Sequence, residues 1–328
     1  MTTLYLDRSG TLLEASGEVL GLRDAAGRLE RRIPIKFLER VIIRARCHLD
    51  SSTLACLSAH EVPVLILDGR AGRRLSHWVG APHNDARRRW GQLLTLATPS
   101  SAATLARAFV HAKIRRQRRT LISIGAARPD LRKPLWDACQ TLQAIEQRLR
   151  NDPALPLDTL RGCEGAGAAA YFPAFFQAFP PRIRPAARNR RPPRDPVNAT
   201  LSLGYTLLYG LAVNACWSAG LDPAIGALHA PAHGRAALAC DLVEPLRGQV
   251  DEWIWQLFRR ELLRPEHFGL EGSGACLLGK AGRAVFWREW EWRSRRWQKL
   301  LDRYAQRLAR EFSQRSPTFD LLDDWESS

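Results

Sequence analysis

The feature that most constrains the fold is a change of hydrophobic period near residue 87. Before it, short apolar runs end at turn residues, which is typical of strands. After it, apolar residues recur every three or four positions, as they do in helices. We therefore predict an α+β protein, with a small N-terminal β-sheet domain over residues 1–82 and a larger all-α domain over residues 83–328.

The predicted elements follow from these two patterns. The expected strands are Thr3–Leu6, Glu18–Leu22, Arg40–Ala45, Val62–Leu67 and Arg74–Val79, and Ser51 is the expected N-cap of a short helix that reaches His60. The expected helices of the second part are Ser101–Ile124, Leu131–Leu149, Asp158–Phe179, Pro196–Ala219, Leu238–Leu263 and Arg283–Phe312. Residues 180–194 are rich in Pro and Arg, so we expect a basic loop there. The acidic residues 320–326 predict a loose tail.

The net charge favours a polyanionic partner. Lys and Arg number 49 against 33 Asp and Glu, a balance of +16. Nucleic acid is the first expectation for such an excess, and an acidic membrane surface the second.

The cysteines and the N-terminus predict a cytoplasmic protein. The seven Cys are scattered, odd in number and without a CxxC motif, as expected for reduced thiols. The N-terminal residues show no positive and apolar signal segment. No run approaches 18 apolar residues, so we expect no membrane span.

Two carboxylates on one helix mark the first candidate site. Asp241 and Glu244 are three residues apart, so they share a helix face, and their neighbours are apolar. Carboxylates near each other in such surroundings require a metal ion or an arginine. His229 precedes them across a loop that contains Pro231 and Gly234. One imidazole with one or two carboxylates suits Mg²⁺ or Mn²⁺. The alternative is that the acids only favour the helix dipole and His229 is an ordinary loop residue.

Other motifs are weaker. His229 and His233 form HxxxH, but Ala230 stands where a zinc protease needs Glu. Residues 165–170 match GxGxxA, yet no strand precedes them, so we reject a dinucleotide site. Glu164 beside them is either solvated or a third metal ligand. The tryptophans interleaved with arginines are either core or a base-stacking surface, and they are Trp253, Trp255, Trp287, Trp290, Trp292 and Trp297.

Taken together, these segments resemble the Cas1 family of CRISPR-associated spacer-acquisition endonucleases and integrases. The matching stretches are GCEGAGAAAYF around Glu164, RNRRPPRDPVNATLSLGYTLLY (Arg188–Tyr209), AGLDPAIGALH (Ala219–His229), GRAALACDLVEPLR (Gly234–Arg247) and GKAGRAVFW near the C-terminus. In the first part, IPIKFLERVIIRA and LSAHEVPVLILD resemble the family's β-domain. The resemblance covers nearly the whole chain. Ala227 and Ala237 depart from the family pattern without touching a predicted ligand.

The resemblance implies a site, partners and a reaction. Glu164, His229 and Glu244 would be catalytic ligands of Mg²⁺ or Mn²⁺, with Asp241 as an auxiliary ligand or an outer partner. The β-domain would mediate a homodimer, and the small Cas2 protein would join two such dimers. The substrates would be branched or double-stranded DNA with 3′-hydroxyl ends and the CRISPR repeat. The phosphates would be bound by basic residues, the candidates being Lys113, Arg115, Arg116, Arg190, Arg191 and Arg247.

The implied reaction is phosphoryl transfer on DNA that inserts captured fragments (spacers) into the CRISPR array. One alternative is a basic architectural DNA-binding protein whose metal site is not catalytic. Another is a metal-dependent phosphodiesterase of small molecules. The charge of +16 favours a polymeric substrate over a small one.

Overall fold

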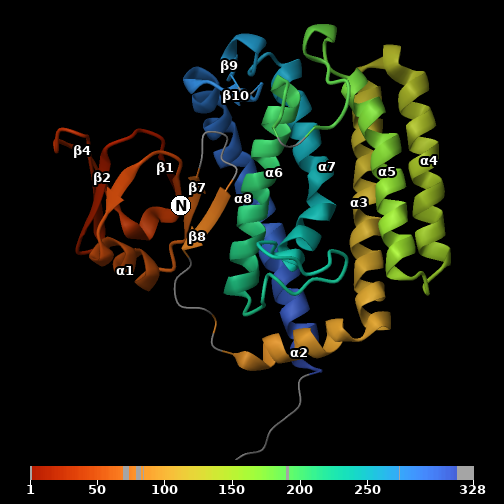
Figure 1. Cartoon of the computed structure of the whole chain (residues 1–328), viewed down its shortest axis with the longest axis horizontal. Coiled ribbons are helices and arrows are strands. Elements are labelled where there is room, and N and C mark those ends of the chain that lie inside the picture. Colours follow the sequence, from red (N-terminus) through yellow and green to blue (C-terminus); the bar gives the residue numbers. More distant parts are fainter. Residues whose placement is uncertain are drawn as a thin grey trace, which may run out of the picture.

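The computed structural model describes residues 2–68, 74–78, 83, 85–189, 192–272 and 274–315. In this part of the chain an N-terminal β-rich unit lies beside a larger helical bundle (Figure 1). The predicted α+β class, with strands first and helices after, is confirmed. The boundary predicted between residues 82 and 83 lies between the last N-terminal strand and the first long helix, and residues 79–82 are outside the described residues.

The N-terminal unit contains two four-stranded sheets. Their orders are β4-β3-β2-β6 and β1-β5-β7-β8. The pairs β1/β5, β5/β7 and β2/β6 are parallel, and β2/β3, β3/β4 and β7/β8 are antiparallel. The elements are β1 (Thr2–Leu6), β2 (Thr11–Ser16), β3 (Val19–Arg23), β4 (Leu29–Pro34), β5 (Leu38–Ile43), β6 (Cys47–Leu49), α1 (Ser51–Ala59), β7 (Val64–Asp68) and β8 (Arg74–Trp78).

Strand β5 shows how the two parts of the molecule share their cores. Val41 and Ile43 belong to the core of the N-terminal unit, whereas Ile42 belongs to the core of the bundle. Successive side chains of a strand point to opposite faces, so the sheet around β5 is buried on both faces. Burial on both faces explains why this run is continuously apolar rather than alternating.

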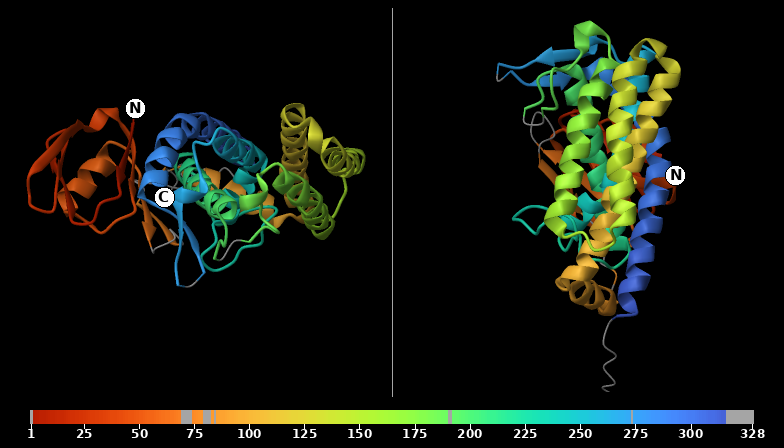
Figure 2. Two further views of the ribbon diagram at one scale, coloured as in Figure 1. Left: turned by 90° about the horizontal axis from the view of Figure 1, so that it is seen from above. Right: turned by 90° about the vertical axis from the view of Figure 1, so that its right-hand side faces the viewer.

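The bundle is built around α3. This helix packs against α4, α5 and α7, while α6 packs against α7 and α8, and α2 against α8. Figure 2 shows most of these helices running side by side, with the sheets on one side of them. Pro99 opens α3, because its fixed φ suits the first position of a helix. The elements are α2 (Ala86–Ala97), α3 (Pro99–Ala127), α4 (Arg132–Asn151), α5 (Leu157–Gln177), α6 (Pro196–Ser218), α7 (Ala237–Arg259), β9 (Phe268–Leu270), β10 (Cys276–Leu278) and α8 (Lys280–Ser313).

Several local predictions need correction. The second part is not all-α, because β9 and β10 pair as an antiparallel hairpin before α8. The N-cap of α1 is Asp50 rather than Ser51, since the Asp50 carboxylate accepts the N–H of Thr53 at 2.7 Å. Strand β4 was not predicted because its first four residues are all exposed, so it shows no alternation. The acidic tail over 320–326 lies outside the described residues.

Helix α6 is long and apolar enough to cross a membrane by length and composition alone. This differs from the expectation that no run approaches 18 apolar residues. In the structure, 67% of its most apolar window is buried inside the protein. That burial is typical of a core helix, and Leu201, Leu208 and Ala212 of α6 are fully buried.

Strand β1 attaches the N-terminal unit to α8. Glu291 accepts the N–H of Thr3 at 3.1 Å and the hydroxyl of Tyr5 at 3.0 Å. The Tyr5 ring lies against Trp287, with 4.8 Å between ring centroids. These contacts give the two units a defined junction in addition to the shared sheet.

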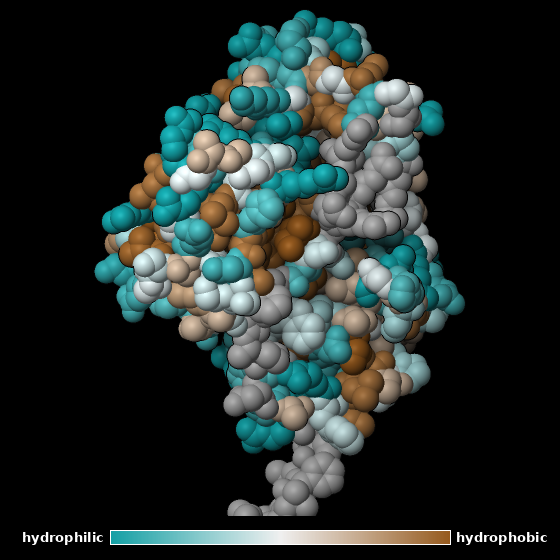
Figure 3. All heavy atoms as spheres, turned by 60° about the vertical axis from the view of Figure 1, so that its left-hand side comes forward, coloured by the Kyte–Doolittle hydropathy of each residue, from teal (hydrophilic) through white to brown (hydrophobic). Residues whose placement is uncertain are grey.

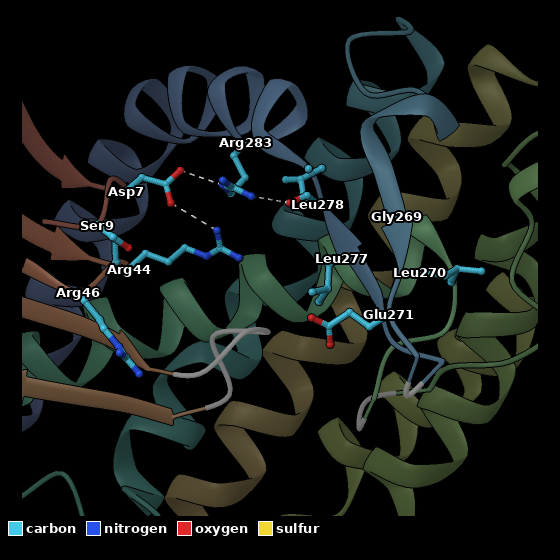
Figure 4. Close-up of a pocket in the computed structure, with 12 residues that line it drawn as sticks. Asp7, Ser9, Arg44, Arg46, Gly269, Leu270, Glu271, Leu277, Leu278 and Arg283 are labelled. Atoms are coloured by element: carbon cyan, nitrogen blue, oxygen red, sulfur yellow. Dashed lines mark hydrogen bonds and ion pairs between the residues drawn. The ribbon is translucent and has the colours of Figure 1, made fainter.

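A cavity of about 660 Å³ lies at this junction, between the N-terminal unit and the β9–β10 hairpin. On one side of it Asp7 bridges two arginines, Arg44 at 3.4 Å and Arg283 at 2.8 Å (Figure 4). None of the predicted metal ligands lines this cavity. It is therefore a feature of the domain junction and not of the candidate site.

The surface carries scattered apolar residues. On the face drawn in Figure 3, they form several separate patches among hydrophilic ones. Large exposed apolar side chains include Leu29 (43% exposed) on β4 and Phe37 (54%) just after it.

Candidate metal centre

The candidate ligands come from helices that meet on α3. Glu164 lies on α5 and Glu244 on α7, and both helices pack against α3. Lys113 of α3 forms ion pairs with both carboxylates, and its Nζ lies 2.6 Å from Oε2 of Glu244. The structure thus brings together two carboxylates that are 80 residues apart in the sequence (244 minus 164) around one ammonium group.

His229 reaches the same place from the loop between α6 and α7. Its Nδ1 lies 2.6 Å from Oδ1 of Asp241, and its Nε2 lies 4.0 Å from Oε1 of Glu244. A carboxylate at Nδ1 favours the tautomer with the proton on that nitrogen. Nε2, the ring nitrogen nearer Glu244, is then the one without a proton, as a metal-binding imidazole requires.

Asp241 is fully buried and holds the loop in place. Its carboxylate accepts the N–H groups of Ala227 at 2.6 Å, Leu228 at 3.0 Å and His229 at 3.1 Å. Together with the imidazole of His229, these donors occupy both oxygens. Asp241 is therefore a positioning residue, and of the two roles implied by the resemblance the outer one fits this geometry.

The charges around Glu244 keep it ionised. Burial alone would raise the pKa of this carboxyl, but the cations Arg247 and Lys113 outweigh that effect and hold the pKa at about 2. Arg247 approaches Oε1 of Glu244 at 3.1 Å. The group is thus an anion throughout the physiological pH range.

Gly226 allows the loop to pass close to the start of α7. A Cβ at this position would lie 2.6 Å from the carbonyl carbon of Ala237 and 2.8 Å from Oδ2 of Asp241. Gly226→Ala should therefore lower the free energy of unfolding by about 1–3 kcal/mol in urea titrations. Gly165→Ala is the matched control, because beyond its chain neighbours and its own helix backbone no atom lies within 4 Å of the new Cβ. It should stabilise the protein by up to about 1 kcal/mol, and equal losses in both variants would contradict the prediction.

A second buried network lies two helical turns beyond the carboxylates. Asp251 of α7 accepts a hydrogen bond from Tyr171 of α5 at 3.1 Å and another from Tyr205 of α6. The Tyr205 ring stacks against Arg247 at 4.9 Å and Arg188 at 5.6 Å. Asp251 thus ties α5, α6 and α7 together, and through Tyr205 it supports the arginine that pairs with Glu244.

Asp251 should give the protein a measurable pH dependence. Burial raises its pKa to about 6, although the hydroxyls of Tyr205 and Tyr171 and the charges of Arg188 and Arg247 oppose the rise. A raised pKa in the folded state means that folding favours the protonated form, so its contribution is lost as the pH rises through 6. The unfolding free energy of the wild type, relative to Asp251→Asn, should therefore increase by about 1 kcal/mol from pH 7 to pH 5. A difference that is flat over this range, measured by urea unfolding at each pH, would contradict the assignment.

The donor set suits a hard or borderline divalent ion. Two carboxylates and one imidazole nitrogen are typical ligands of Mg²⁺ or Mn²⁺. As the side chains stand, no group of three or more His, Cys, Asp and Glu residues in the described part of the chain is close enough to hold an ion. The Lys113 ammonium already provides a positive charge between Glu164 and Glu244. The ligand types of Glu164, His229 and Glu244 thus suit a divalent cation.

The predicted DNA contacts are either exposed, paired with carboxylates, or outside the described residues. Arg115 is exposed on α3, as a phosphate contact requires. Lys113 is only 4% exposed and paired with the carboxylates, which does not fit its predicted role as a DNA-phosphate contact. Arg116 is paired with Glu252, and Arg247 with Glu244. Arg190 and Arg191 lie outside the described residues.

Sequence reasoning missed the role of Lys113, although a signal was present. Lys113 occupies a position in the buried stripe of α3, between Val110 and Gln117. A single lysine on an apolar helix face requires an anionic partner. The partners of Asp251 carried no comparable signal, because tyrosines on apolar helices are ordinary core residues.

The weaker motifs behave as ordinary structure. Residues 165–170 lie within α5, and His229 and His233 lie in a loop, so neither a dinucleotide site nor a zinc-protease helix is present there. The core interpretation of the tryptophans is confirmed for Trp253, Trp255, Trp287, Trp290 and Trp297. Trp292 differs, since it is 69% exposed and stacks with Arg293. All seven cysteines are free thiols.

Comparison with known proteins gives a consistent result. A family model described as "CRISPR associated protein Cas1" matches residues 4–292. The CRISPR-associated endonuclease Cas1 1 of Thermodesulfovibrio yellowstonii is 32% identical over 320 residues, which cover 95% of this chain and 98% of that protein. A protein of the same description from Thermus thermophilus is 34% identical over 284 residues, covering 86% and 83%.

Solved structures share the fold. A Cas1 protein from Thermotoga maritima superposes with a TM-score of 0.82 at 21% identity, covering 95% of this chain and 97% of that one. A casposase bound to its integration product gives 0.81 at 22% identity, covering 98% and 93%. A chain of a Cas6-RT-Cas1–Cas2 complex gives 0.79 at 24% identity, covering 98% of this chain and 36% of that one.

Proposed function

The chain belongs to the CRISPR-associated Cas1 family, and we propose that it is a divalent-metal-dependent DNA endonuclease and integrase that inserts captured DNA fragments into a CRISPR array. One observation carries the proposal. Glu164, His229 and Glu244, from three separate segments of the chain, converge on one charged cluster around Lys113, in which Glu244 is buried and the other two are partly exposed. The names of the relatives, which include endonucleases, support the same reading.

Glu164, His229 and Glu244 would hold Mg²⁺ or Mn²⁺. When bound, the ion would supply Lewis-acid stabilisation of the negative charge that develops on the reacting phosphate. Asp241 fixes the His229 ring and its tautomer, so that Nε2 is available. Arg247 pairs with Oε1 of Glu244, the oxygen that His229 also faces, and so helps to fix this carboxylate.

The proposed reaction exchanges one phosphodiester bond for another. The 3′-hydroxyl of the captured fragment attacks a phosphorus of the target strand, a new P–O bond forms, and the bond to the departing 3′-oxygen breaks. With water as the attacking group, the same exchange is hydrolytic cleavage. Exposed arginines of α3, Arg115 and Arg119, would position the DNA through its phosphates without reading its sequence.

Strand joining and cleavage on a branched duplex with a 3′-hydroxyl end test this function. We expect joining with Mg²⁺ or Mn²⁺ and its loss with EDTA. An architectural protein with a non-catalytic metal site would bind the duplex and leave it unchanged. A phosphodiesterase of small molecules would instead prefer a nucleotide phosphodiester to the branched DNA, so both substrates should be compared.

We further propose that the N-terminal unit mediates a homodimer and that a Cas2 protein is the companion. Strand β4 is at the end of its sheet order, and Leu29 on β4 and the nearby Phe37 are exposed apolar residues. A structural neighbour is itself named as a complex with Cas2. Sedimentation of the purified chain should report two chains per particle, and Leu29→Glu with Phe37→Glu should reduce this to one. A particle of unchanged size would place the dimer contact elsewhere.

A further inference from the structure

Lys113 is buried between two carboxylates that come from other helices. Its side chain is 5% exposed, and Glu244 beside it is 2% exposed. Glu164 is the more accessible partner at 32%. The rest of the buried stripe of α3 around Lys113 includes Val110 and Ile114, which offer it no charge.

The ammonium balances a pair of charges that would otherwise repel. Two carboxylates that approach each other away from water disfavour their ionised forms unless a cation lies between them. Lys113 supplies that cation to both Glu164 and Glu244. A divalent ion held by the same two carboxylates would lie within a few ångströms of the ammonium, and like charges at that separation repel strongly.

We propose that Lys113 is a resident counter-ion of the metal centre, which keeps Glu164 and Glu244 together before a divalent ion binds and leaves them when it does. The inference rests on the proposed function, in that these residues hold a divalent metal. Loss of a metal ligand or of a residue that positions one would weaken metal binding, and a counter-ion predicts the opposite effect. Removing the positive charge of Lys113 should strengthen metal binding rather than weaken it.

The test compares Lys113→Met with Lys133→Met. Lys133 is 82% exposed on α4 and pairs with Asp137 at 2.7 Å, so its replacement makes the same change in net charge away from the site. Binding of Mn²⁺ to each full-length variant is measured by calorimetry, and thermal unfolding is followed with and without Mn²⁺. We expect Lys113→Met to bind Mn²⁺ about tenfold or more tightly than the wild type. Without metal it should unfold at a lower temperature than the wild type. Added Mn²⁺ should then raise its unfolding temperature by more than it raises that of the wild type.

Two further variants show where the change acts. Lys113→Arg keeps a positive charge and should bind Mn²⁺ nearly as the wild type does. Adding Glu164→Gln to Lys113→Met should remove the gain in affinity, because one of the two carboxylates is then neutral. Lys133→Met should leave the affinity for Mn²⁺ unchanged.

The outcomes separate this inference from the proposed function. If the wild type binds Mn²⁺ and Lys113→Met binds it equally or more weakly, the counter-ion role is overturned and the metal site stands. If neither protein binds Mn²⁺ or Mg²⁺, the metal site itself fails, and the counter-ion role fails with it. If Lys113→Met is unfolded without metal, Mn²⁺ should restore the folded circular-dichroism signal. Failure of Mn²⁺ to do so would also overturn the role.

Discussion

Replacing Glu164 with alanine should lower the rates of strand joining and cleavage by about a thousandfold or more. The change removes one of two carboxylates proposed to hold the metal, and groups that act as one unit lose most of their effect when a single member is missing. Initial rates on the branched duplex, with Mg²⁺ and with Mn²⁺, measure the effect. Glu266→Ala is the control. Glu266 is exposed and follows α7, so its replacement makes the same change in net charge away from the site.

The fold should survive this substitution. Lys113 keeps its ion pair with Glu244, and Glu164 is itself partly exposed, so the thermal unfolding curve should stay cooperative. Full activity in Glu164→Ala, or activity that resists EDTA, would make the cluster structural. The chain would then have to be treated as a DNA-binding protein without this catalytic site.

Asp241→Asn should have the largest effect on stability, although it changes few atoms. The carboxylate accepts three backbone N–H groups and faces Nδ1 of His229 while fully buried. An amide offers one oxygen, and its NH₂ group would face N–H donors, so buried polar groups would lose their partners. We expect the free energy of unfolding to fall by about 3–5 kcal/mol, because a buried charged network is broken by removing one member.

The same substitution should also reduce activity. Without the carboxylate, neither the orientation nor the tautomer of His229 is held, and losing such an outer partner costs about 10–100-fold in metal affinity or rate. Urea unfolding and the joining assay measure the two effects separately. Asp222→Asn is the control in the same loop, since Asp222 accepts one N–H, that of Ala224 at 2.8 Å, at a more exposed position. Similar losses in both variants would show that Asp241 has no special role.

Local patterns predicted much of the architecture. The period of apolar residues located all six predicted helices to within a few residues, because a helix that buries one face has apolar residues every three or four positions. The same reasoning failed for β4, whose first four residues are all exposed, and for β6, β9 and β10, which are three residues long. It also missed β2, six residues long, and α2, twelve residues long, which are neither short nor fully exposed. Strands that bury little or are very short leave no period to detect.

The candidate site divides in the same way. The three-residue spacing of Asp241 and Glu244 placed them on one face of a helix, and both prove to be buried on α7. Their different roles did not follow from that spacing. Asp241 binds the loop, while Glu244 faces Lys113, because the start of α7 meets the loop and the next turn meets α3.

The sequence by itself determined the class of fold, the residue types of the donor set and the family to which the chain belongs. Only the tertiary structure decided that Lys113 lies between Glu164 and Glu244, 51 and 131 residues away along the chain (164 minus 113 and 244 minus 113). Only it brought Tyr171, Tyr205 and Asp251 together from three helices. The physical reason is that the helical period of apolar residues indicates which face of a helix is buried, but not which helix covers that face. The packing of α5 and α7 on α3 determines which charged side chains meet at the buried faces.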